Sequence, residues 1–357
     1  MPFTILSIAH PLIPVSSDTA GGAEQILSIL DRHIVAAGGR SVVMAAAGSR
    51  VSGQLIPTPG SNGEIDREVC ALAAFEHRRI LARTLHDFDV DIVHMHGLDF
   101  YEYLPESSIP CLATLHLPPE RYPQAIFTGA WPHLRLNCVS KDQQRRCPRN
   151  VETVLHGIDV AAFSARVKKN NYAVALGRIC PEKGLHLAID AARRARIPLL
   201  IAGQVFPCAA HERYFLGEIA PRLGRRVRFI GAAGFRRKRR LLGGARCALI
   251  ASTMAEGSSL VAMEALACGT PVVAFRCGAL PEIVEHGRTG FIVENESEMA
   301  KAIRRAGDLN PEDCRKSARE RFSAARMAEE YFRIYREMIA RRQCQPSSTF
   351  SCAASSV

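Results

Sequence analysis

The apolar positions of this chain follow two alternating patterns along nearly its whole length. Short apolar runs bounded by turn residues, typical of buried strands, alternate with stretches in which apolar residues recur every three or four positions, as in amphipathic helices. In the first half this pattern predicts strands at 3–8, 41–45, 91–95, 111–115 and 136–139, helices at 23–37 and 69–85, and loops at 47–66 and 97–110.

The second half repeats the alternation, with predicted strands at 172–176, 199–202, 227–230, 248–251, 272–274 and 291–293. Strands that alternate with helices form parallel sheets covered on both faces. We therefore predict an α/β fold of two doubly wound, Rossmann-like domains that face a cleft. The predicted segments are a first domain (1–160), a second domain (172–322), a helix (323–342) and a disordered tail (343–357).

Length and composition agree with a two-domain globular protein. A chain of 357 residues is long for a single core. No apolar run approaches the roughly 20 residues that span a bilayer, and the N-terminus has no basic segment typical of a signal peptide, so we expect a cytoplasmic protein. None of the twelve cysteines forms a Cys-x-x-Cys pair, which argues against a zinc ribbon or a thioredoxin-like site.

Charge is distributed unevenly between the two halves. The first 165 residues carry 13 Lys and Arg against 17 Asp and Glu, whereas the remainder carries 33 against 18. A basic second half suits a domain that binds a diphosphate. The basic run Arg236–Arg240 and the C-terminal helix are expected to be solvated faces, or contacts for an acidic partner or the acidic inner face of a membrane.

The run Ala255–Ala274 contains two glutamates, Glu256 and Glu264, eight residues apart. It follows a predicted strand, and a helix is expected to open near Ser258. Loops after the strands of a parallel sheet lie at the edge where ligands bind, and the free N–H groups of a helix N-terminus favour an anion. The two glutamates are therefore expected to hold different parts of one ligand whose phosphates lie between them, as in a nucleotide-sugar.

The loop Gly177–Gly184 also follows a predicted strand and precedes a helix. It places Arg178 and Lys183 at the same sheet edge, where two cations can neutralise a diphosphate. The glycine-containing loop 18–24 includes Gly21 and Gly22, whose backbone N–H groups can approach a phosphate.

Three histidines end strands of the first half. His116 follows the strand 111–115 and is expected to hydrogen-bond the sugar or take a proton. His94 and His96 are expected to point to opposite faces of their strand, with His96 the better candidate for the cleft. The Asp-x-Asp in 87–91 lies at the opposite edge of the sheet, so we expect no metal and a metal-independent mechanism.

These motifs resemble those of family 4 glycosyltransferases, which are retaining enzymes of the GT-B fold. The glutamate-x7-glutamate run and the Gly-Arg…Lys-Gly clamp match in type and spacing, and the likeness covers about residues 3 to 340. Ser258 and Ser259 stand where many members carry Phe-Gly. The segments 155–159 and 278–284 also match, and the N-terminal segments 21–24, 91–96 and 114–116 match more weakly.

The resemblance implies transfer of a hexose from a nucleotide-diphosphate sugar to an acceptor hydroxyl with retention of configuration, in the synthesis of a polysaccharide or glycoconjugate. The donor is a co-substrate; no cofactor, metal or nucleic acid is expected, and the sugar, lipid-linked or small-molecule acceptor is unknown. The expected catalytic residues are His116, Arg178, Lys183 and Glu256. The expected donor-binding residues are Gly21, Gly22, Arg178, Lys183, Glu256, Gly257, Ser258, Ser259, Leu260, Val261 and Glu264.

Two other functions are compatible with the sequence. A GT-B relative with different chemistry, a nucleotide-sugar epimerase or a phosphorylase, would use the same donor contacts. A nucleic-acid-binding protein would account for the net charge of +11, but the chain carries no recognition motif for it.

Overall fold

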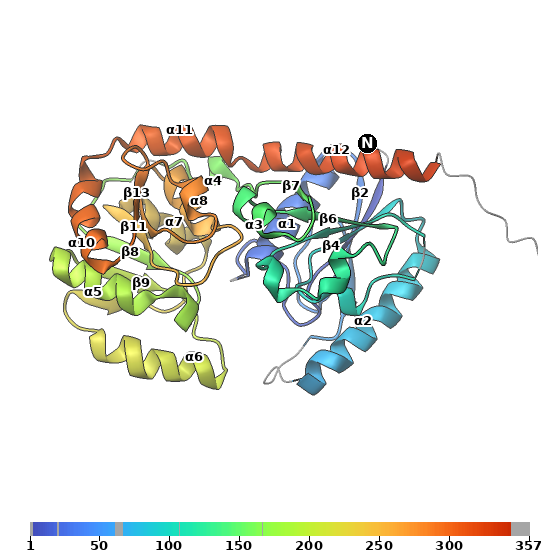
Figure 1. The fold of residues 1–357 in the computed structure, drawn as a ribbon, viewed down its shortest axis with the longest axis horizontal. Helices are drawn as coiled ribbons and strands as arrows, with labels where there is room; N and C mark the ends of the chain where they lie inside the picture. The colour runs from blue at the N-terminus through green and yellow to red at the C-terminus, as the bar shows by residue number, and fades with distance from the viewer. Residues whose placement is uncertain (1–2, 20, 61–66, 107, 166, 344–357) are drawn as a thin grey trace, which may run out of the picture.

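The computed structural model describes residues 3–19, 21–60, 67–106, 108–165 and 167–343, which form two lobes side by side (Figure 1). Each lobe is built on one parallel sheet with helices packed on its faces, so the predicted α/β architecture with two sheets is confirmed. The domain boundaries given above remain a prediction. Of the predicted tail, residues 344–357 lie outside the described part of the chain.

The sheet of the first lobe has the strand order β3-β2-β1-β4-β5-β6-β7. Alternate residues of β1 enter different cores: Leu6 packs on one face of the sheet and Ile5 on the other, as the two-residue period of a strand requires. The elements are β1 (Thr4–Ile8), α1 (Gly22–Ala36), β2 (Arg40–Ala46), β3 (Gln54–Thr58), α2 (Arg67–Asp87), β4 (Ile92–Met95), β5 (Cys111–Thr114), β6 (Leu134–Cys138), α3 (Lys141–Arg146) and β7 (Glu152–Thr153).

The sheet of the second lobe has the order β10-β9-β8-β11-β12-β13. Its two faces are covered by separate apolar clusters, one of which includes α5 and α10 and the other α8 and α11. The elements are α4 (Val160–Phe163), β8 (Ala173–Leu176), α5 (Leu185–Ala195), β9 (Leu199–Ala202), α6 (Ala209–Tyr214), β10 (Val227–Phe229), α7 (Phe235–Gly244), β11 (Cys247–Ile250), α8 (Leu260–Ala267), β12 (Val272–Phe275), α9 (Leu280–Ile283), β13 (Gly290–Val293), α10 (Glu296–Arg305), α11 (Pro311–Arg321) and α12 (Ala324–Gln343).

Strand β3 corrects the expectation of a loop over residues 47–66. It pairs with β2 at the edge of the first sheet, where Pro57 lies opposite Ala45. Proline has no N–H to donate and is tolerated at an edge, but it interrupts the apolar pattern by which a strand is recognised in a sequence.

The chain crosses between the lobes twice, and the two crossings pair with each other. The Ile158 N–H donates to the Phe322 carbonyl at 2.8 Å, and the Ala324 N–H donates to the Ile158 carbonyl at 2.8 Å. Gly157 is required by this close approach, because a Cβ there would lie 2.5 Å from the Ser323 carbonyl oxygen.

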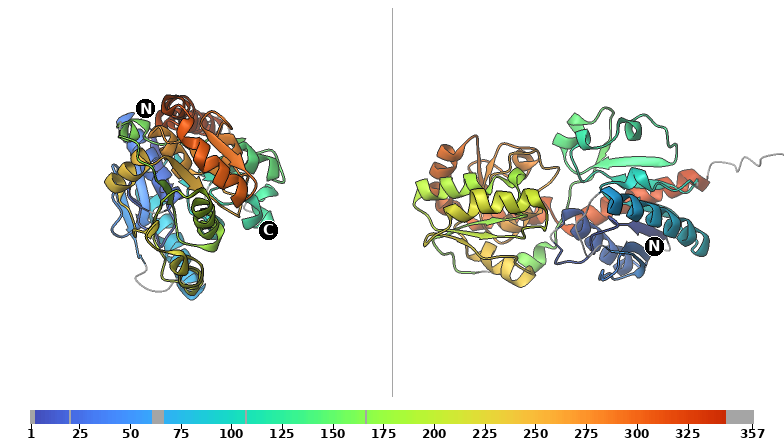
Figure 2. Two further views of the ribbon diagram at one scale, coloured as in Figure 1. Left: turned by 90° about the vertical axis from the view of Figure 1, so that its left-hand side faces the viewer. Right: turned by 90° about the horizontal axis from the view of Figure 1, so that it is seen from below.

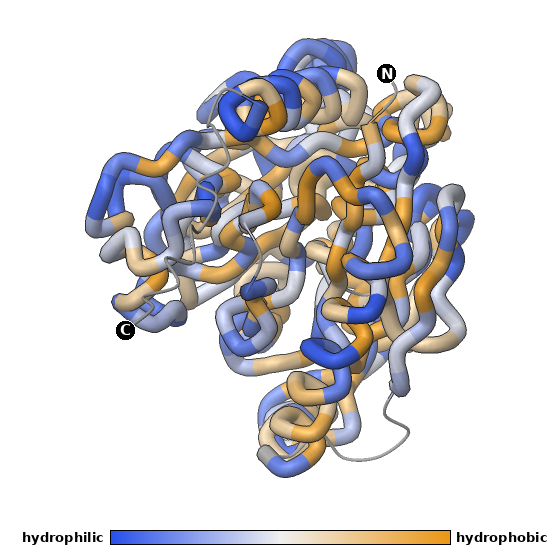
Figure 3. The backbone as a smooth tube through the Cα atoms, turned by 90° about the vertical axis from the view of Figure 1, so that its right-hand side faces the viewer, coloured by the Kyte–Doolittle hydropathy of each residue, from blue (hydrophilic) through white to orange (hydrophobic). Residues whose placement is uncertain are grey.

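After the second crossing, α12 lies along the first lobe (Figures 1 and 2). Its residues Met327, Tyr331 and Tyr335 are fully buried and pack with Ile5 of β1 and Ile26 of α1. Hydrophilic and hydrophobic residues alternate along the tube in Figure 3, and both kinds occur on its outer turns. Among the described residues, no helix is both long and apolar enough to cross a membrane.

Candidate active site

The loop between β11 and α8 carries both glutamates of the motif. Helix α8 begins at Leu260 with Ser259 as its N-cap, two residues later than expected, and Glu264 lies in its second turn. The side-chain hydroxyl of Ser259 does not cap the helix, and the Ser258 Oγ is buried without a hydrogen-bond partner in the described part of the chain. The first turn of α8 therefore keeps its N–H groups and a hydroxyl available for a ligand.

Glu256 and Lys183 meet at the carboxyl edge of the second sheet. The Lys183 Nζ lies 2.8 Å from the Glu256 Oε1, which also accepts a hydrogen bond from the Ser252 hydroxyl. The Glu256 carbonyl accepts a hydrogen bond from the Ala279 N–H at 3.0 Å. The preceding Gly278 has a φ of 53° and packs closely on this backbone, since a Cβ there would lie 2.5 Å from the Glu256 nitrogen. The Gly177–Gly184 loop and the Ala255–Ala274 run are thus in direct contact through Lys183 and Glu256. The close packing at Gly278 is the reason for a glycine in the 278–284 segment.

Glu264 has a partner that sequence reasoning missed. Its side chain is 3% exposed, and its Oε1 forms an ion pair with Lys238 of α7, whereas its Oε2 is buried without a partner among the described residues. Burial raises the pKa of Glu264, and the Lys238 ammonium opposes that shift. The expectation that the whole run Arg236–Arg240 is a solvated or membrane-facing surface is therefore wrong at Lys238, although three of its arginines are exposed.

The glycine-containing loop of the first lobe reaches the second lobe at α8. A Cβ on Gly22 would lie 3.8 Å from the Leu260 side chain. Gly21 is the N-cap of α1, and Glu24 in the first turn of that helix is buried. Burial raises the pKa of Glu24, and the charge of Arg178 from the second lobe acts in the opposite direction. The sequence carries no local sign of this electrostatic interaction, because Arg178 lies far from Glu24 along the chain.

Four imidazoles form a row that runs from β4 through the end of β5 to the segment that crosses between the lobes. The His96 Nδ1 and the His116 Nε2 are 3.2 Å apart, and ring centroids are separated by 3.9 Å for His94 and His96 and by 5.4 Å for His116 and His156. The expectation that His94 and His96 face opposite ways is wrong, because residues two apart in a strand share a face.

These histidines are uncharged at neutral pH. Burial lowers the pKa of His116 to about 3, and burial with neighbouring imidazoles holds the pKa of His96 and His156 well below its ordinary value. The His116 Nδ1, the His96 Nε2 and both ring nitrogens of His156 are buried without partners in the described segments. The row can exchange hydrogen bonds with a ligand but supplies no positive charge.

Three contacts join loops and helix starts of the first lobe to those of the second lobe. A Cβ on Gly257 would lie 3.5 Å from the His116 carbonyl oxygen, so the loop that carries Glu256 packs directly against the end of β5. The Glu282 carboxylate accepts hydrogen bonds from the Lys141 and Asp142 N–H groups at the start of α3. The Asp18 carboxylate accepts one from the Phe235 N–H at 3.0 Å.

The two α/β lobes thus meet near the first turn of α8, with the Lys183–Glu256 pair in the second lobe and the histidine row in the first. Residues 159–321 match the family model of the glycosyl transferases group 1. The match covers a little under half of the chain, and in this segment the chain is similar to that family of glycosyltransferases.

Curated relatives match parts of the chain. The D-inositol 3-phosphate glycosyltransferase of Saccharomonospora viridis is 32% identical over an alignment of 225 residues that covers 54% of this chain and 51% of the relative. The chain thus spans about half the length of that relative and less of others, such as 36% of the enzyme of the same name from Mycobacteroides abscessus.

Solved structures match nearly the whole chain and confirm the predicted GT-B fold. The sucrose-phosphate synthase of Thermosynechococcus elongatus has a TM-score of 0.79 at 19% identity and covers 95% of this chain and 100% of that one. HepE of Anabaena, solved in complex with UDP-glucose, has a TM-score of 0.72 at 19% identity and covers 94% and 99%.

Proposed function

We propose that this protein transfers a hexose from a uridine-diphosphate sugar to an acceptor hydroxyl with retention of configuration. The observation that carries the proposal is the start of α8 beside the Lys183–Glu256 pair. Ser258, just before the helix, and Glu264, in its second turn, each have a buried oxygen without a partner among the described residues. Buried polar atoms without partners are rare, and a ligand that satisfies them accounts for their presence.

The diphosphate binds at the start of α8. The N–H groups of this turn, from Ser258 to Val261, point toward the phosphates, and the helix dipole favours their negative charge. Arg178 and Lys183 supply two cations on the neighbouring loop. Of these, Arg178 is exposed and free to form a two-point contact with phosphate oxygens.

Glu264 binds the nucleoside end of the donor. Its Oε1 is occupied by Lys238, which leaves the Oε2 to accept hydrogen bonds from the ribose hydroxyls. Glu256 and His116 bind the hexose, because the Glu256 loop packs against the end of β5, where the His116 Nδ1 has no partner in the described residues.

In the reaction, the acceptor oxygen forms a bond to the anomeric carbon while the bond from that carbon to the phosphate oxygen breaks. The acceptor proton passes to the departing phosphate oxygen, so the diphosphate itself serves as the base. Lys183 and the α8 N–H groups stabilise the negative charge that develops on the leaving group. This route keeps the configuration of the sugar without a protein carboxylate as base.

A thermal-shift screen with UDP-, GDP- and ADP-sugars tests the proposal. A ligand at 100 times its dissociation constant stabilises a protein by about 2.7 kcal/mol, so a UDP-sugar should raise the melting temperature clearly above the effect of an ADP-sugar. HepE was solved with UDP-glucose, which makes this donor the first to test. Stabilisation by none of the three classes would contradict a donor site in this position.

Substitutions at the two glutamates should separate donor binding from turnover. We expect Glu256→Gln to lower kcat while the dissociation constant of free UDP stays unchanged, because Glu256 contacts the sugar. We expect Glu264→Ala to weaken UDP binding by roughly ten- to a hundredfold, since a hydrogen bond to a charged group contributes about 1.5–3 kcal/mol. Isothermal titration with UDP and steady-state kinetics measure both quantities, and the opposite pattern would show that the roles are reversed.

Transfer at saturating donor should persist in EDTA. In the proposed mechanism the charge of the leaving group is neutralised by Arg178, Lys183 and the α8 N-terminus, so no divalent ion is needed to hold it. The measurement is the initial rate before and after chelation. Complete loss of the rate, restored by Mg²⁺ or Mn²⁺, would contradict this mechanism.

A further inference from the structure

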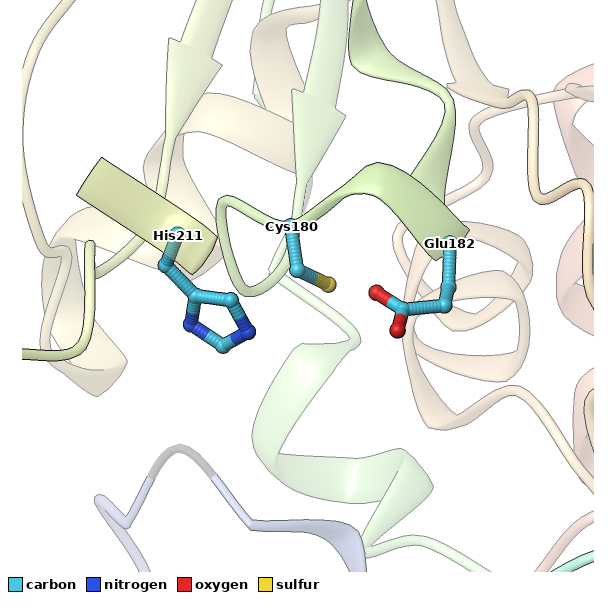
Figure 4. A group of neighbouring side chains, drawn as sticks. All are labelled: Cys180, Glu182 and His211. Carbon is cyan, nitrogen blue, oxygen red and sulfur yellow. The ribbon is translucent and has the colours of Figure 1, made fainter. Parts of the chain in front are cut away.

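The loop that carries Arg178 and Lys183 also carries side chains that the donor site does not use. Cys180 and Glu182 lie on this loop, and His211 lies on α6. One potential ligand atom from each residue lies within 4.8 Å of the others. Figure 4 shows the Cys180 thiol between the His211 imidazole and the Glu182 carboxylate.

Burial and hydrogen bonding set this cluster apart from a surface ion pair. Cys180 is only 1% exposed, and its thiol lies 3.8 Å from the Arg178 carbonyl oxygen, which is a weak contact. The His211 Nδ1 is buried and has no hydrogen-bond partner among the described residues. Figure 4 shows this nitrogen on the side of the ring away from Cys180, whereas the other ring nitrogen faces the thiol. One imidazole nitrogen, the Cys180 thiol and the Glu182 carboxylate therefore lie close together.

We propose that Cys180, Glu182 and His211 bind a zinc ion. Zinc accepts sulfur, nitrogen and carboxylate oxygen ligands, and bond lengths of about 2.0–2.3 Å place tetrahedral ligand atoms about 3.5 Å apart. The cluster reaches that spacing by side-chain movements of about 1 Å. On binding, the Cys180 thiol releases its proton to solvent, the thiolate and the carboxylate balance the two charges of the ion, and water takes the fourth position.

This ion does not touch the donor; it positions the loop that does. Cys180 and Glu182 flank Pro181 directly before Lys183, and the Glu182 carbonyl accepts a hydrogen bond from the Thr253 N–H at 2.9 Å, three residues before Glu256. A bound zinc would therefore fix α6 to the loop before Lys183, and through the Glu182–Thr253 hydrogen bond it would also restrain the loop that carries Glu256. This consequence rests on the proposed function, whereas the binding of zinc does not.

Cobalt titration of the full chain, freed of metal by a chelator, tests the site directly. We expect one Co²⁺ per chain, a thiolate-to-cobalt charge-transfer band, displacement of the cobalt by Zn²⁺, and a higher melting temperature with Zn²⁺. Both Cys180→Ser and His211→Ala should abolish the band. Cys277→Ser is the matched control, because this half-buried cysteine of the second lobe lies outside the cluster and its removal should leave the band unchanged.

The outcomes separate the site from the donor chemistry. Absence of stoichiometric cobalt binding in the wild-type chain, or an unchanged band in a folded His211→Ala variant, would overturn the zinc site whatever the transfer assay shows. If zinc lowers the donor KM at least severalfold in the wild type but not in His211→Ala, while kcat is unchanged, the positioning role is supported. Zinc binding without any change in KM would overturn that role.

Discussion

Replacing Lys183 with alanine should lower kcat/KM for hexose transfer by about 10²- to 10³-fold, the range expected when one group that stabilises a developing negative charge is removed. The Lys183 Nζ lies 2.8 Å from the Glu256 Oε1, so in the proposed mechanism it is close to both the hexose and the leaving diphosphate. Steady-state kinetics with a UDP-sugar measure the loss, and most of it should fall on kcat.

Lys301→Ala is the control for this substitution. Lys301 is exposed on α10, a helix that carries none of the proposed donor contacts. Its replacement by alanine removes the same charge from the same lobe. We expect its kcat/KM to equal that of the wild type. Equal losses in both variants would mean that only the net charge of the lobe matters, and the assignment of Lys183 to the leaving group would be wrong.

Replacing Lys238 with methionine should lower the free energy of unfolding by about 3–5 kcal/mol, the cost of removing one partner of a buried ion pair. The two side chains are 17% and 3% exposed, so water cannot replace the lost charge at Glu264. Methionine preserves the length and apolar stem of lysine, and chemical denaturation at pH 7 measures the loss. Arg240→Met, at an exposed position two residues along the same helix, should change the stability by less than about 0.5 kcal/mol.

The loss in free energy of unfolding caused by Lys238→Met should depend on pH in a defined direction. Burial already raises the pKa of Glu264, and removal of the lysine takes away the group that opposes this rise. A carboxyl whose pKa is higher in the folded state binds its proton more tightly there than in the unfolded chain. The deficit relative to wild type should therefore be smallest at acid pH and grow as the pH rises above the ordinary glutamate range, through the raised pKa of Glu264 in the wild type. A deficit independent of pH would show that lost packing, not an uncompensated carboxylate, is the cause.

Much of the molecule could be predicted because its signals are local. The apolar runs that became β8, β11 and β12 are short and bounded by turn residues, and the spacing of Glu256 and Glu264 places one before and one within the same helix. This spacing alone gives the order of strand, loop and helix. That order in turn places Glu256 and Glu264 at the carboxyl edge of the sheet. The edge strand β3 escaped recognition because Pro57 interrupts its pattern.

The partners in the site were decided by tertiary structure. Lys238 reaches Glu264 from a different helix, His211 approaches Cys180 from α6, and the histidine row joins strands β4 and β5 to the crossing segment. The sequence by itself determined which elements form and which residues stand at their ends, because hydrophobic periodicity and turn chemistry act over a few neighbouring residues. Burial, charge pairing and unpartnered polar atoms depend on contacts between segments far apart in the chain, and only the packed fold settles those.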